Sequence, residues 1–127
     1  MAHPFHAHTG LTIESAANGA ARLRMKWKSE HTQDQGVLQG GYLAMIADAA
    51  VHTAADTLSK PGEILTTIEL KTNFLGSARA GEWIVGEAVP AHLGRTTQVW
   101  DVTVTNETTD RTIALQRCTQ MVLYPTP

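Results

Sequence analysis

One long apolar segment, from Tyr42 to Leu58, constrains the fold of this chain more than any other feature. Alanine occupies six of its positions, and because alanine is the strongest helix former, the segment predicts a helix. Lys60-Pro61-Gly62 predicts where that helix stops. Leu43, Met45, Ile46 and Val51 make the helix apolar almost all round. Other structure must therefore enclose it.

The rest of the chain is typical of β-structure. Alternation is clearest over residues 20–28, where Ala21, Leu23, Met25 and Trp27 share one face, and Asn18-Gly19 predicts a tight hairpin before them. The expected strands are 9–15, 20–28, 65–75, 82–91, 96–106 and 112–123. The order predicts an α+β fold with one antiparallel sheet curled around one helix, in a single domain over residues 1–127. Its outer face and edges favour self-association.

Charge and composition exclude several classes of protein. The 10 basic and 12 acidic side chains give a net charge of −2, which disfavours nucleic-acid binding. No apolar run approaches the roughly 20 residues that span a bilayer, so we expect no membrane insertion. With a lone Cys118 and no secretory signal in the first ten residues, we expect a cytoplasmic protein. We expect no metal site.

Asp48 is the one residue of the helix that core packing does not explain. An ionised carboxylate among alanines and aliphatic side chains is costly unless it is paired, hydrogen-bonded or used in catalysis. A structural role, bonded to a neighbouring strand or exposed at an interface, remains an alternative. His52 lies one turn further along, on the same helix face, and could orient the carboxylate, line an acyl pocket or be hydrogen-bonded in the interior.

Gly40-Gly41 stand where the helix begins, so free backbone N–H groups there could stabilise an oxyanion, or the glycines could simply form a tight turn. Eight residues separate Gly40 from Asp48, about 12 Å along a helix at 1.5 Å per residue. One chain cannot bring both groups to one carbonyl. If both act in one reaction, the site lies between two subunits, and the protein is an obligate dimer.

The segment from His31 to Ala50, with Gln33, Gly36, Gln39-Gly40-Gly41 and Asp48, resembles the signature of the hotdog-fold thioesterases of the phenylacetic-acid-degradation type. The similarity continues through 65–75, Ala80-Gly81-Glu82 and Gly94-Arg95, and covers residues 10–124. It implies hydrolysis of acyl-CoA thioesters to free acid and CoA, with no cofactor besides the CoA of the substrate. It also implies a hotdog fold and a homodimer as the minimum assembly, with a dimer of dimers expected.

The resemblance implies a role for each matching residue. Asp48 matches the catalytic acid, Gly40 the amide that polarises the thioester carbonyl, and Thr67 a hydroxyl that positions the water or the carboxylate. Gln33 stands at a position where the family has Asn, and Gln39 at a position where it has His. Glutamine cannot titrate near neutral pH, so Gln39 could orient groups without exchanging a proton. Proton transfer would therefore fall to Asp48.

Strand alternation places Thr67 with Glu69, Lys71 and Asn73, opposite Ile68 and Leu70. Thr67 would then reach the site only if that face meets a partner, or if a local bulge turns the side chain. The further candidates for substrate binding are Gly41, His52, Thr66, Lys71, Arg79 and Arg95. Lys71, Arg79 and Arg95 could bind the phosphates of CoA. Two other functions remain open at this point: a non-catalytic acyl-CoA binding or sensing module, and a hotdog hydroxyacyl-thioester dehydratase.

Overall fold

A computed structural model describes residues 4–32, 36 and 38–124 of the chain. Its elements are two α-helices, a short 3-10 helix and strands of 6 to 13 residues. In chain order they are α1 (Pro4–Thr9), β1 (Thr12–Ala17), β2 (Ala20–Lys26), η1 (Ser29–His31), α2 (Gly40–Asp56), β3 (Ile64–Phe74), β4 (Trp83–Leu93), β5 (Thr97–Asn106) and β6 (Arg111–Leu123).

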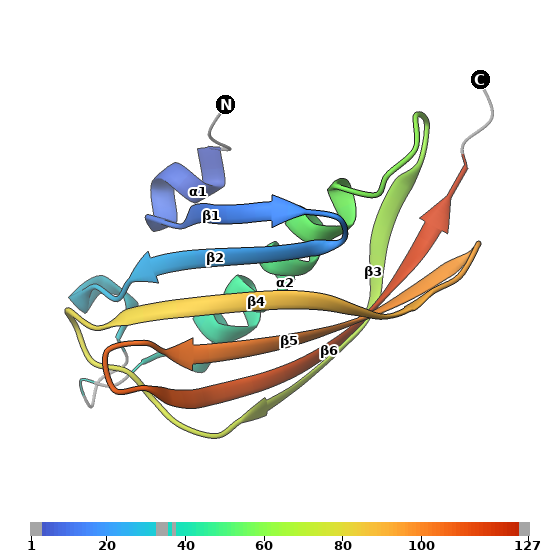
Figure 1. The fold of residues 1–127 in the computed structure, drawn as a ribbon. Coiled ribbons are helices and arrows are strands. Elements are labelled where there is room, and N and C mark those ends of the chain that lie inside the picture. The colour runs from blue at the N-terminus through green and yellow to red at the C-terminus, as the bar shows by residue number, and fades with distance from the viewer. Residues whose placement is uncertain (1–3, 33–35, 37, 125–127) are drawn as a thin grey trace.

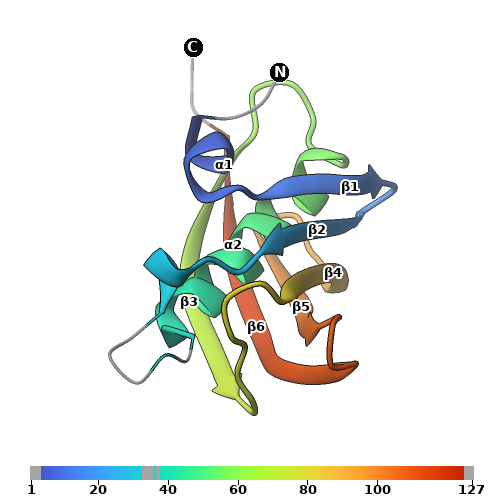
Figure 2. The same cartoon turned by 90° about the vertical axis from the view of Figure 1, so that its left-hand side faces the viewer.

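The strands form one sheet in the order β1-β2-β4-β5-β6-β3, and all neighbours are antiparallel. The sheet is curved, and α2 lies in its hollow, as two views at right angles show (Figures 1 and 2). This arrangement confirms the predicted hotdog fold. β3 is the last strand of the sheet, so one of its two edges has no neighbour within the described chain.

The core forms between α2 and the inner face of the sheet. Ala21, Leu23, Met25 and Trp27 are all buried, which confirms the alternation read from the sequence. The helix buries the side chains that face the sheet: Leu43, Ile46, Ala47, Ala50, Val51, Ala54 and Ala55. Gly86 of β4 lets α2 pack close against the sheet, because a Cβ atom there would lie 2.7 Å from Ile46 Cγ2. The position of α2 therefore depends on this glycine.

Three local predictions differ from the structure. Thr9 was expected to begin a strand but ends the helix α1, and β1 starts only at Thr12. The segment 29–31, which lies between the expected strand 20–28 and the helix with no element predicted for it, is a 3-10 turn that buries His31. α2 begins at Gly40, with Gln39 as the N-cap residue, and ends at Asp56, two residues before the end of the apolar segment that predicted it. Pro90 lies beside a register shift in β4, where a bulge accommodates a residue that has no N–H to donate to the ladder.

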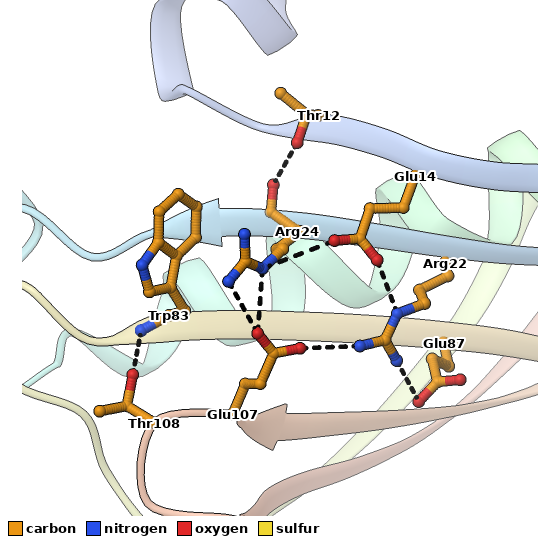
Figure 3. A network of polar contacts seen from close by, with 8 residues as sticks. All are labelled: Thr12, Glu14, Arg22, Arg24, Trp83, Glu87, Glu107 and Thr108. Atoms are coloured by element: carbon orange, nitrogen blue, oxygen red, sulfur yellow. Dashed lines mark hydrogen bonds and ion pairs between the residues drawn. The ribbon is translucent and has the colours of Figure 1, made fainter.

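Ion pairs cover the outer face of β1, β2 and β4 (Figure 3). Glu107 accepts hydrogen bonds from both Arg22 and Arg24, and Glu14 bonds Arg22. The Arg24 guanidinium also lies 3.8 Å from the centre of a Trp83 ring. All these groups are partly exposed to solvent, so they stabilise the strand pairing modestly and in a salt-dependent way.

Among the helices of residues 4–32 and 38–124, none has the length and apolar character needed to cross a membrane.

Candidate functional site

Asp48 lies on the side of α2 that faces the edge strand β3. Its helix neighbours Ala47 and Ala50 are fully buried, whereas the Asp48 side chain keeps 38% of its surface exposed. The carboxylate is therefore at the surface of the core rather than within it, and remains accessible to a ligand. Asp48 Oδ1 accepts a hydrogen bond of 3.3 Å from the Thr67 hydroxyl.

A β-bulge brings Thr67 to Asp48. The pairing of β3 with β6 shifts between Thr67 and Glu69, which leaves Ile68 as the extra residue. Before the bulge Thr67 lies opposite the buried Gln120, and after it Leu70 lies opposite the buried Cys118. Thr67 and Leu70 therefore share the inner face, and the prediction that they lie on opposite faces was wrong. Simple alternation cannot register an inserted residue.

His52 completes the group. Its Nε2 atom lies 3.6 Å from Asp48 Oδ1 and 3.5 Å from Thr67 Oγ1, so the three side chains surround one small volume. Of the alternatives for His52, this geometry matches an imidazole beside the carboxylate. The ring keeps 41% of its side-chain surface exposed, which rules out a fully enclosed core histidine.

The start of α2 forms a second polar centre. Gln39 is the N-cap residue but its side chain makes no capping bond; its own N–H donates to the His31 carbonyl. In the described part of the chain, the N–H groups of Gly40 and Gly41 have no acceptor. A Cβ at Gly40 would lie 3.3 Å from the Phe74 ring, so this glycine keeps the helix start close to β3.

The buried His31 side chain packs against Tyr42, near this helix start. Its ring packs between Trp27 and Tyr42, with centroid distances of 4.9 Å and 4.7 Å, and its Nδ1 accepts a hydrogen bond from Lys28 N–H. Burial lowers the pKa of His31 below its usual range, because the charged ring would lose hydration. His31 is therefore neutral at physiological pH and acts as a packing residue in this geometry. Gln33 lies outside the described residues.

The two polar centres lie at different places along one molecule. Gly40 is beside Phe74 and Asp48 is beside Thr67, and eight helical residues, about 12 Å, separate the first pair from the second.

The other candidates for substrate binding are dispersed. Gly41 is exposed at the helix start, whereas Thr66 and Lys71 lie on the outer face of β3, away from Asp48. Arg95 is in the turn between β4 and β5, where its carbonyl accepts a bond from the Tyr124 hydroxyl. Arg79 lines a cavity of about 250 Å³ beside the β5–β6 turn, together with Arg111, Asn106, Glu82, Ser77, Ala78 and Thr109.

Sequence reasoning missed Gln120. This residue is fully buried on the inner face of β6, and its Nε2 donates to Thr67 Oγ1 at 2.6 Å. A signal was present, because Gln116 and Gln120 are in phase with the buried residues Cys118 and Val122. A polar side chain at a core-facing position needs a partner, and that partner is the candidate site.

Comparison with known proteins identifies the family of the chain. A family model described as "Thioesterase superfamily" matches residues 35–113. A 1,4-dihydroxy-2-naphthoyl-CoA hydrolase of Listeria monocytogenes is 32% identical, and the match covers 87% of this chain and 88% of that protein. Human acyl-coenzyme A thioesterase 13 is also 32% identical, over 87% of this chain and 78% of that protein.

Solved structures give the same fold. A putative esterase of Mycobacterium tuberculosis has a TM-score of 0.89 at 28% identity, covering 98% of this chain and all of that one. A mutant of the phenylacetic acid degradation protein PaaI from Thermus thermophilus has a TM-score of 0.87 at 26% identity, covering 95% of this chain and 100% of that one. The chain therefore belongs to the thioesterase superfamily and is a thioester hydrolase of the hotdog fold.

Proposed function

We propose that the protein hydrolyses acyl-CoA thioesters to a free acid and CoA, with Asp48 as the catalytic carboxylate. The observation that carries the proposal is the accessible Asp48 carboxylate held by Thr67 and His52. Relatives that are 32% identical act, by name, on acyl-CoA and on a naphthoyl-CoA. The free N–H of Gly40 is the group that stabilises the oxyanion when the thioester carbonyl is attacked.

The two groups meet across a dimer. β3 has an unpaired edge, and Leu70 and Phe74 of its inner face remain 45% and 56% exposed. A long apolar edge strand is a template for pairing with another chain. Antiparallel pairing of two β3 strands about a two-fold axis at Lys71, with Ile68 bulged out of this ladder too, sets Thr67 opposite the other copy's equivalent of Phe74. Asp48 of one copy then lies beside the helix start of the other.

In this dimer the thioester carbonyl binds against the Gly40 amide of one subunit. The Asp48 carboxylate of the other either removes a proton from the attacking water or adds to the carbonyl to give a mixed anhydride, and in both routes CoA leaves as the thiolate. A single turnover in heavy-oxygen water separates the routes. General-base catalysis places the label in the acid product, whereas anhydride hydrolysis at the Asp48 carbonyl places it in the protein.

The proposal predicts thiol release from a panel of aliphatic and aromatic acyl-CoAs. Asp48→Asn should lower kcat by about 10²–10⁴-fold, the usual contribution of a catalytic acid or base. Asp56→Asn is the matched control, because Asp56 is exposed at the end of the same helix. Near-normal turnover in the Asp48→Asn variant would refute the mechanism.

The oxyanion role is tested at Gly40. Proline is tolerated at the first position of a helix and has no N–H, so Gly40→Pro removes the proposed donor, and its Cβ crowds the Phe74 ring. Gly40→Ala adds the same crowding against Phe74 but keeps the N–H. We expect Gly40→Pro to lose about 10²–10³-fold in kcat and Gly40→Ala to lose far less.

Mixing the two inactive variants tests the shared site. A heterodimer of Asp48→Asn and Gly40→Pro chains has one site with both groups intact, so statistical exchange of subunits should restore about a quarter of wild-type activity. If each site lies within one chain, mixing restores nothing. Light scattering on the same samples measures whether the protein is a dimer.

A further inference from the structure

We propose that Gln120 is a positioning residue, whose amide directs the single hydroxyl hydrogen of Thr67 onto the Asp48 carboxylate. The inference rests on the proposed function and extends it to a residue that has no contact of its own with Asp48 among the bonds of the described chain. Gln120 lies on β6 directly opposite Thr67 on β3, and its side chain is fully buried.

The hydrogen bonds of Gln120 fix the orientation of its amide. Nε2 donates to Thr67 Oγ1 at 2.6 Å and to Cys118 Sγ at 3.0 Å, so both N–H groups have acceptors. Only Oε1 is without a partner in the described part of the chain. The reverse orientation would leave two buried donors unsatisfied in place of one acceptor, which is the more costly arrangement.

The orientation of the Gln120 amide determines the direction of the hydrogen bond between Thr67 and Asp48. A threonine hydroxyl has one hydrogen to donate, and here its oxygen already accepts from Gln120. An ionised carboxylate only accepts, so the Thr67 hydrogen is directed to Asp48 Oδ1, 3.3 Å away. His52 Nε2, 3.5 Å from the same hydroxyl, and the Cys118 thiol, which also hydrogen-bonds Thr67, are the competing partners. Gln120 thereby holds Thr67 and Asp48 in one fixed arrangement.

The same two strands contain a natural control. Gln116 of β6 is buried opposite Thr72 of β3, and its Nε2 donates to Thr72 Oγ1 at 2.9 Å, again with Oε1 unpartnered among the described residues. The two glutamine–threonine pairs thus have the same chemistry and similar burial. They differ in the partner of the threonine, since Thr72 has no bond to Asp48 in the described structure, whereas Thr67 does.

The test measures kcat and KM for Gln120→Leu, Thr67→Val and the double variant, with one acyl-CoA that the wild type hydrolyses. We expect Gln120→Leu to lower kcat about tenfold with little change in KM, the effect of losing one hydrogen bond made in the transition state. In the Thr67→Val background, the Gln120 substitution should change kcat no further, because its effect passes through the missing hydroxyl. Gln116→Leu should keep the wild-type kcat.

A second variant covers loss of stability. Gln120→Met has nearly the same length and shape but cannot donate a hydrogen bond to Thr67, so kcat should fall although the side chain still fills the site. Thermal unfolding of every variant accompanies the kinetics.

Three results would overturn the role of Gln120: kcat within about twofold of wild type in folded Gln120 variants, losses that multiply with Thr67→Val, or an equal loss in Gln116→Leu. If Asp48→Asn remains inactive in these cases, the proposed function stands and only this inference falls.

Discussion

Substituting Gly86 by alanine tests how α2 is positioned on the sheet. The backbone of Gly86 is not in the left-handed region, so removing a glycine there would by itself stabilise the protein by about 0.4–1 kcal/mol through the unfolded chain. The structure predicts that Gly86→Ala instead destabilises the protein. The new Cβ would lie 2.7 Å from Ile46 Cγ2, short of the 3.4 Å at which ordinary van der Waals contact begins.

The magnitude depends on the packing around Ile46. This side chain is fully buried, and Ala50 Cβ lies 3.8 Å from the same position, so the side chain has little room to move and the helix must shift. Overpacking of this kind costs about 1–3 kcal/mol. For a domain of this size we expect the Tm to fall by about 4–12 °C. Because Asp48 is two residues from Ile46, the shift should also lower kcat.

Thermal unfolding by circular dichroism measures the effect, with two controls. Ile46→Leu lacks the Cγ2 atom, so it should recover most of the stability lost in Gly86→Ala, a coupling that a double-mutant cycle quantifies. Gly41→Ala meets no atom within 4 Å and should raise the Tm, as expected for alanine in place of glycine in a helix. A Gly86→Ala variant as stable as wild type, with no coupling to Ile46→Leu, would refute the steric argument.

Three further predictions concern titratable groups. Protonating His31 would charge a buried ring and break its bond from Lys28 N–H, and its pKa in the folded state is lowered. The contribution of neutral His31 to stability is therefore complete above about pH 6.5 and is lost as the pH falls below that value. The free energy of unfolding, measured in urea, should therefore decrease less with falling pH in His31→Gln than in wild type. Glu107→Gln should cost about 0.5–1 kcal/mol at low salt and less at high salt, measured by urea unfolding, because its exposed carboxylate bonds both Arg22 and Arg24. Burial raises the pKa of the Cys118 thiol, so native protein should react slowly with a thiol reagent and add no background to the thiol-release assay; rapid labelling without denaturant would contradict its burial.

Much of the architecture could be predicted from local pattern. Alternation over 20–28 gave the buried face of β2, and the alanine-rich run gave α2, because the periods of strand and helix repeat in the sequence itself. The helix also places His52 four residues after Asp48, on the same face, without help from the rest of the fold. These features depend on neighbours in sequence, which the sequence displays directly.

The arrangement around Asp48 was decided only by tertiary structure. Thr67 faces the carboxylate because of a bulge in the pairing of β3 with β6, and that pairing joins residues about 50 apart in sequence. Gln120 enters the site through the same pairing, as the partner opposite Thr67. The register of two distant strands is set by how their side chains pack against α2, and no local period encodes that choice. The sequence by itself therefore determined the helix, the strands and the place of Asp48 on the helix, while the folded sheet determined which hydroxyl and which amide lie around that carboxylate.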